Sequence, residues 1–179
     1  MEDFAPRDRA LAAEPGAHAA AVLDVQERCG QALFGLACRL GLSEELAADA
    51  VQEMLTRLWS ALRRGEAVEH PDAWAFRVLY RLAMDEHRLH RRANGVIERL
   101  GRARRDRPSD PQVAADELAV WSAVDRLPVR QRVVLCLRYR GDLPYEQIGS
   151  ILGISAGAAR THVATGLATL RRQLAEDEG

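Results

Sequence analysis

The stretch from Asp142 to Leu174 constrains the fold most, because its apolar residues and turn signals alternate as in two helices joined by a tight turn. Pro144 and Glu146 suit the first turn of a helix, since proline has no N–H to leave unpaired there and a carboxylate meets the positive end of the helix dipole. Gly153 predicts the end of that helix, because glycine adopts the left-handed C-cap conformation at little cost. Ser155 then predicts the N-cap of a second helix.

The second helix of this pair divides into an apolar and a polar face. The residues expected to face inward recur at helical spacing and are Ala159, Val163, Leu167 and Leu170. The residues expected to face outward are Arg160, Thr161, His162 and Thr165. This is the layout of a helix-turn-helix, in which the second helix enters the major groove of DNA. An ordinary helical hairpin remains the alternative for this stretch taken alone.

The composition favours an all-α protein without an overall affinity for nucleic acid. The 179 residues suffice for one domain or two small ones, and alanine, leucine and arginine dominate over the few aromatic residues. All 25 basic residues are arginine, but the net charge is −1. Any DNA binding must therefore come from local patches, or from a complex in which a partner supplies much of the affinity.

The cysteines and the apolar segments point to a cytoplasmic protein without metal or cofactor. Cys29, Cys38 and Cys136 have no zinc-like spacing, so we expect buried thiols in a reducing compartment rather than redox or metal sites. No stretch reaches the apolar length of a membrane span, and the N-terminus lacks the pattern of a signal peptide. We therefore expect no membrane insertion.

The order of helical patterns and breakers predicts two domains. Residues 1–18 are expected to form a loose tail, 19–92 a first helical domain, 93–112 a linker, and 113–175 a second domain that contains the helix-turn-helix. The linker is rich in glycine, proline and arginine and has too little apolar content for a core of its own. The expected helices before the helix-turn-helix span about 19–40, 44–64, 71–91, 114–126 and 129–139.

Four segments, in this order, resemble an extracytoplasmic-function sigma factor of the sigma-70 family. DAVQEMLTRLW at 49–59 looks like the polymerase-binding helix of that family, and WAFRVLYRLAMD at 74–85 like its promoter-melting helix. LPVRQRVVL at 127–135, together with YEQIG at 145–149 and GISAG at 153–157, looks like its reader of the minus-35 element. The resemblance covers roughly 22–92 and 115–174 and implies a region 2 and a region 4 domain.

The resemblance implies a transcription initiation factor, not an enzyme. Such a factor binds core RNA polymerase, directs it to promoter DNA and is commonly held inactive by an anti-sigma factor. The residues implied in polymerase binding are Asp49, Gln52, Glu53, Arg57, Leu58 and Trp59. Those implied at the minus-10 element are Trp74, Arg77, Arg81 and Arg88. Those implied at the minus-35 element are Ser155, Gly157, Arg160, Thr161, His162 and Thr165.

The chain departs from the family at two places in these helices. Arg81 stands where the family usually has asparagine, which bears on how a flipped minus-10 base is read. The recognition helix carries fewer cations than is usual, which predicts fewer phosphate contacts and a shallower dependence of binding on salt. Without the resemblance, the polar face of 49–57 would be explained as a solvated helix surface with a Glu53–Arg57 pair.

Two other classes of function stay open as alternatives. A helix-turn-helix regulator would use the N-terminal half as a dimerisation or sensor domain, and would not need core polymerase. A helical enzyme is disfavoured, because Asp85, Glu86 and His87 are consecutive and point to different sides of a helix, and no motif supplies a nucleophile, phosphate loop or metal set.

Overall fold

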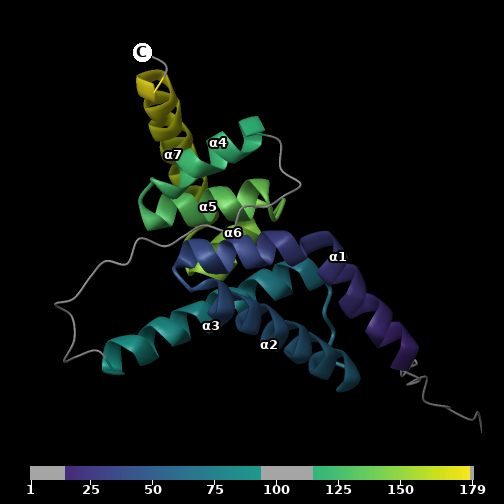
Figure 1. Ribbon diagram of the computed structural model, residues 1–179. Helices are drawn as coiled ribbons and strands as arrows, with labels where there is room; N and C mark the ends of the chain where they lie inside the picture. The colour runs from purple at the N-terminus through teal and green to yellow at the C-terminus, as the bar shows by residue number, and fades with distance from the viewer. Residues whose placement is uncertain (1–14, 94–114, 178–179) are drawn as a thin grey trace, which may run out of the picture.

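The computed structural model describes residues 15–93 and 115–177, and all the secondary structure in these ranges is helical (Figure 1). The all-α prediction is therefore confirmed. The predicted tail lies outside the described residues except for 15–18, which form the first turn of the first helix. The predicted linker also lies outside them, except for residue 93, which ends the third helix.

Three helices build the N-terminal half: α1 (Pro15–Leu40), α2 (Glu44–Arg63) and α3 (Pro71–Ala93). Each packs against the other two. The core between the three helices includes large side chains with no exposed surface, among them Leu33, Leu36, Met54, Leu58, Phe76 and Leu79. Burying large apolar side chains contributes about 1.5–3 kcal/mol each, so this shared core holds the three helices together.

The ends of these helices are capped by nearby residues and by one contact from another helix. Ser43 Oγ accepts a hydrogen bond from the Leu46 N–H at 3.3 Å, which makes Ser43 the N-cap of α2. Gly65 follows α2 with φ +73°. His87 of α3 donates from Nε2 to the Leu40 carbonyl at 2.7 Å and so satisfies a carbonyl at the end of α1.

Four helices build the C-terminal half: α4 (Ala115–Asp125), α5 (Val129–Tyr139), α6 (Tyr145–Leu152) and α7 (Ala156–Asp177). The predicted turn between α6 and α7 is confirmed, since Gly153 has φ 68° and ψ 36° and Ser155 Oγ accepts from the Ala158 N–H at 3.1 Å. Gly149 is a further requirement of this turn. A Cβ there would lie 2.7 Å from the Ile154 carbonyl oxygen, closer than any real Cβ approaches.

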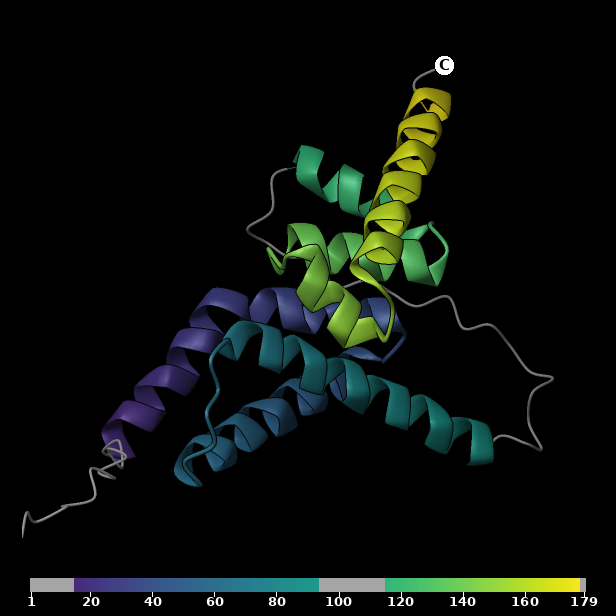
Figure 2. The same ribbon diagram turned by 180° about the vertical axis from the view of Figure 1, so that it is seen from behind.

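The two halves lie against each other, an arrangement that the sequence did not predict. α1 packs on α5, and α3 packs on α6, so that one buried apolar cluster runs through both halves. Figure 2, seen from behind, shows the light-green α6 beside the teal α3. Gly141 belongs to this contact, because a Cβ there would come within 3.0 Å of the Phe76 ring of α3.

Polar contacts centred on Arg39 and Arg77 join the halves. Arg39 Nε of α1 lies 3.0 Å from Asp125 Oδ1 of α4, in an ion pair whose side chains are only 17% and 12% exposed. The guanidinium groups of Arg39 and Arg140 lie over the Trp121 ring, 4.9 and 4.8 Å from its centroid. Arg77 Nη2 of α3 donates to Ser150 Oγ of α6 at 3.0 Å.

Candidate nucleic-acid and polymerase interfaces

The outer face of α7 is exposed where the sequence predicted base and phosphate contacts. Arg160, Thr161 and Thr165 are exposed, and His162 is half-buried. The predicted inward residues are buried or half-buried, namely Ala159, Val163, Leu167 and Leu170. The predicted division of this helix into two faces is therefore confirmed, and its polar side chains face outward from the core.

A row of threonines runs along this outer face. Thr161 Oγ1 donates to the Gly157 carbonyl at 3.0 Å, Thr165 Oγ1 to the Thr161 carbonyl at 2.9 Å, and Thr169 Oγ1 to the Thr165 carbonyl at 3.0 Å. Because each hydroxyl proton is used within the helix, each threonine offers a partner a methyl group and oxygen lone pairs. Thr169 was not predicted, although its spacing of four residues from Thr165 is a visible signal.

The first turn of α7 is exposed where the sequence predicted a phosphate contact. Ser155 and Gly157 are exposed, as a contact with a phosphate requires. Ser155 Oγ caps the N–H of Ala158, and the Ser155 carbonyl accepts from Ala159 at 3.0 Å. The other N–H groups of a first helical turn have no partner within their helix and carry the positive end of its dipole. A phosphate oxygen can take their hydrogen bonds.

The aromatic ring of Tyr145 lies beside the recognition helix. The guanidinium carbon of Arg160 is 5.0 Å from the ring centroid, and that of Arg138 is 5.6 Å from it. Tyr145 is half-buried and packs against the core, whereas Arg160 is exposed. Tyr145 was quoted in the sequence pattern of the motif but was not predicted as a site residue.

The polar face of α2 is exposed as expected for a contact with a protein partner. Its exposed residues are Asp49, Gln52, Glu53 and Arg57. The predicted i, i+4 pair is present, with Arg57 Nε 2.8 Å from Glu53 Oε1 and both side chains about half exposed.

Two residues predicted beside this face are placed differently from its polar members. Leu58 has no exposed surface, because it continues the buried stripe of Met54 and Leu55 by one helical turn. It therefore packs in the core beneath α2. Trp59 is half-buried, and its ring meets the His18 ring edge-on at a centroid distance of 6.2 Å.

The four predicted minus-10 residues of α3 differ in how they are held. Trp74 is half-buried and packs against the core. Arg77 is engaged by Ser150 of the other half, and Arg88 Nη1 lies 2.7 Å from Asp85 Oδ1. Arg81 is exposed. The structure thus does not bring these side chains together as one uniform basic surface.

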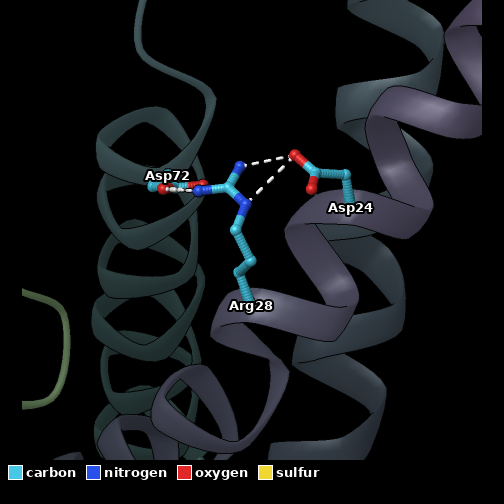
Figure 3. Close-up of polar contacts among 3 residues, drawn as sticks. All are labelled: Asp24, Arg28 and Asp72. Carbon is cyan, nitrogen blue, oxygen red and sulfur yellow. Dashed lines mark hydrogen bonds and ion pairs between the residues drawn. The ribbon is translucent and has the colours of Figure 1, made fainter.

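The start of α3 is tied to α1 by Arg28, which contacts two carboxylates (Figure 3). Its Nη2 lies 2.7 Å from Asp24 Oδ2, and its Nη1 hydrogen-bonds Asp72 in the first turn of α3. The hydrogen bonds that Arg28 donates to both carboxylates raise the pKa of its guanidinium group, and the bond to Asp24 lowers the pKa of that carboxyl group. This cluster links α1 to the first turn of α3, the helix that carries the predicted minus-10 residues.

The thiols are placed as structural groups. Cys29 and Cys136 are buried as predicted, and Cys38 is half-buried. Burial raises the pKa of both Cys29 and Cys136 to about 11, since it disfavours the charged thiolate. A thiol that stays protonated is a poor nucleophile and a poor metal ligand.

Two family models match the chain, one in each half. The model of sigma-70 region 2 matches residues 25–93, and that of sigma-70 region 4 matches 117–170. Together these stretches make up more than half of the 179 residues. Within residues 15–93 and 115–177, no helix combines the length and the apolar character that crossing a membrane requires.

Relatives and solved structures agree with these matches. The ECF RNA polymerase sigma factor SigL of Mycobacterium tuberculosis is 28% identical over 89% of this chain and 92% of its own length. The RNA polymerase sigma factor SigV of Bacillus subtilis is 26% identical over 83% of this chain and 87% of its own length.

The fold is similar to that of two proteins solved in complex with a partner. RpoE, in complex with the anti-sigma factor NepR from Bartonella quintana, superposes with a TM-score of 0.73 at 21% identity, over 88% of this chain and 96% of that chain. CnrH, in complex with the cytosolic domain of CnrY, superposes with a TM-score of 0.56 at 22% identity, over 92% and 98%. With both region matches in place, the chain belongs to the sigma-70 family of RNA polymerase sigma factors, in its extracytoplasmic-function group.

Proposed function

We propose that this sigma factor binds core RNA polymerase through the polar face of α2, and positions α3 on the minus-10 element and α7 on the minus-35 element. It acts in the cytoplasm as an initiation factor and catalyses no reaction of its own. The observation that carries the proposal is the exposed outer face of α7 on a helix-turn-helix whose turn is closed by Gly149, Gly153 and Ser155.

The minus-35 element is read by a short set of groups with distinct chemistry. Arg160 supplies N–H donors, which suit a phosphate or the O6 and N7 acceptors of guanine. Thr161 and Thr165 already donate their hydroxyl protons to the helix, so they contact thymine methyl groups or accept hydrogen bonds from adenine or cytosine amino groups. Ser155 and Gly157 hold a phosphate at the helix start.

The minus-10 element is bound along the exposed side of α3. Arg81 and Arg88 supply positive charge to a melted strand, which single-stranded DNA needs beside a base pocket. Arg81 can only donate hydrogen bonds, whereas the usual asparagine both donates and accepts. The flipped base is therefore held through acceptor atoms such as a ring nitrogen or a carbonyl oxygen.

Core polymerase is bound by the acidic and amide side chains of α2. Asp49, Gln52 and Glu53 complement the arginines that the clamp coiled coil presents in this family. Trp59 offers a partly exposed ring beside them. Arg57 is already paired with Glu53, so it orients this carboxylate.

The two halves have to part when both promoter elements are bound. Arg77 of α3 and Ser150 of α6 are 3.0 Å apart, whereas elements centred near −10 and −35 are about 85 Å apart along B-DNA at about 3.4 Å per base pair. We infer that the contact between the halves belongs to a state off the promoter. By likeness to RpoE bound to NepR and CnrH bound to the cytosolic domain of CnrY, an anti-sigma factor would hold that state.

A run-off transcription assay with purified core polymerase tests the proposal. Arg160→Ala should lower transcription from a promoter selected out of a genomic library and leave assembly with core polymerase unchanged. Gln52→Ala with Glu53→Ala should weaken assembly instead. A chain that binds promoter DNA alone and never assembles with core polymerase would be a helix-turn-helix regulator, which would replace this proposal.

A further inference from the structure

Two guanidinium groups share the ring of Tyr145, at 5.0 Å for Arg160 and 5.6 Å for Arg138. Their other contacts differ. Arg138 Nη1 also reaches the Leu143 carbonyl at 3.3 Å and Asp142 Oδ1 at 3.4 Å, so it is anchored beside the ring. Arg160 lies in the exposed first turns of α7, and within residues 15–93 and 115–177 its guanidinium group lies over the Tyr145 ring.

The ring is held in a fixed place relative to α7. Tyr145 begins α6, is half-buried and packs against the apolar core. The turn that follows leaves no room for adjustment, because a Cβ on Gly149 would lie 2.7 Å from the Ile154 carbonyl, and the Ile154 N–H donates to the Gly149 carbonyl at 3.0 Å. The ring is therefore a rigid platform beside the recognition helix.

A guanidinium group that lies against an aromatic ring can still donate hydrogen bonds to another partner. Its N–H bonds lie in its own plane, so stacking on an aromatic face leaves the donors directed outward. An arginine side chain loses substantial rotamer freedom when it is held for a hydrogen bond, and a prior stacking contact removes part of that cost before DNA arrives.

We propose that Tyr145 is a positioning residue for promoter recognition, whose ring holds the Arg160 guanidinium in the orientation in which it contacts the minus-35 element. The proposal rests on the proposed function of α7. It adds a residue of α6 that touches no DNA itself and acts through Arg160.

The experiment is a double-mutant cycle on the holoenzyme, assembled with core polymerase and titrated with a labelled promoter fragment. Tyr145→Leu keeps an apolar side chain against the core and removes the ring, so the affinity for the minus-35 element should fall about two- to fivefold, the range of an exposed cation–π contact. Tyr145→Phe should restore it, since the ring face remains. In an Arg160→Ala background, Tyr145→Leu should cause no further loss.

The dependence of affinity on salt supplies a readout that a loosened fold would not imitate. If Arg160 contacts a phosphate, Arg160→Ala reduces the slope of log K against log salt by about 0.9, and Tyr145→Leu reduces it in the same direction. If Arg160 contacts a base, both variants instead relax the preference at the same base pair. Tyr139→Leu is the matched control, because that tyrosine is 55% exposed on α5 and outside the proposed site.

The outcomes separate the two proposals. An equal loss from Tyr145→Leu with and without Arg160 would overturn the positioning role, and so would a Tyr145→Phe variant as weak as the leucine variant. If Arg160→Ala weakens binding while Tyr145→Leu does not, positioning fails and the reading of DNA by α7 stands. If Arg160→Ala leaves minus-35 binding unchanged, the proposed function of Arg160 itself fails.

Discussion

The two halves of the molecule hold their arginines in different ways. In the N-terminal half, carboxylates hold them: Arg28 lies between Asp24 and Asp72, Arg57 pairs with Glu53, and Arg88 pairs with Asp85. In the C-terminal half, aromatic rings lie against them. Trp121 contacts Arg140, and also Arg39 of α1, whereas Tyr145 contacts Arg160 and Arg138. Arg138 has a carboxylate partner as well, Asp142 at 3.4 Å.

The difference decides what each arginine can still do. A carboxylate takes up N–H donors and cancels the charge, so the pair serves the fold or keeps the surface neutral. A ring contacts the face of the guanidinium and leaves its charge and its donors to another partner. Arg39 uses both modes, since it lies over Trp121 and also pairs with Asp125. It is the arginine of α1 that joins the two halves.

Removing Arg39 should have the largest effect, because its ion pair with Asp125 is mostly shielded from water. Arg39→Ala withdraws the partner of a carboxylate in a low-dielectric place and leaves Trp121 with one cation fewer, at a cost of about 3 kcal/mol to the contact between the halves. Small-angle scattering should show a larger radius of gyration, and urea unfolding should begin at a lower concentration.

The matched control is an arginine–carboxylate ion pair that is exposed to solvent. Arg57→Ala breaks the pair with Glu53, whose side chains are about half exposed, and should change the free energy of unfolding by less than about 1 kcal/mol. Unchanged scattering and unchanged unfolding of the Arg39 variant would show that the halves are held by their apolar contacts alone.

A substitution at Gly149, beside the turn between α6 and α7, should have the next largest effect on stability. Gly149→Ala places a methyl group 2.7 Å from the Ile154 carbonyl oxygen, where the backbone has to shift, at a cost of about 1–3 kcal/mol. Differential scanning calorimetry should record a lower midpoint. Gly30→Ala in α1 is the control, since its Cβ meets only the Gln26 side chain at 3.8 Å and should stabilise the helix by about 0.5–1 kcal/mol. Equal midpoints for the two variants would contradict the close approach.

The contrast between carboxylate-bound and ring-bound arginines also predicts that removing a carboxylate can increase the affinity for DNA. Asp85→Asn removes the charge that Arg88 now faces at 2.7 Å, so the holoenzyme should bind a single-stranded minus-10 oligonucleotide about two- to fivefold more tightly at low salt. Fluorescence anisotropy measures this, and the gain should fade as salt is raised. Glu66→Gln releases Arg64 from an equivalent pair at 2.7 Å away from α3 and should leave the affinity unchanged. No gain from Asp85→Asn would mean that Arg88 stays outside the DNA path.

The helices could be predicted from signals between residues that are neighbours in sequence. Contacts between residues far apart in sequence could not. Ser43, Gly153 and Ser155 act on their own helix ends, so their roles can be read from their neighbours in sequence. The Arg39–Asp125 pair joins residues far apart in the chain, and its formation depends on how the two halves lie.

The candidate site shows the same division. The outward row of α7 follows from helical periodicity, but the stacking of Arg160 on Tyr145 needs the angle between α6 and α7. Leu58 was predicted near the polymerase contact from the family resemblance and is buried, because it lies on the apolar stripe of α2 with Met54 and Leu55.

The smallest effect should be a dependence of stability on pH in the cluster of Arg28. The hydrogen bond from Arg28 lowers the pKa of Asp24 below its ordinary value of 3.8. A lowered carboxyl pKa in the folded chain adds stability that is fully present above the unfolded value and is lost as pH falls through the folded one. Asp24→Asn should therefore lower the urea midpoint slightly at pH 7 and flatten its fall below about pH 4 by the same small amount, because the pair is exposed. An unaltered acid limb in this variant would show that the pair of Arg28 with Asp24 contributes no measurable stability.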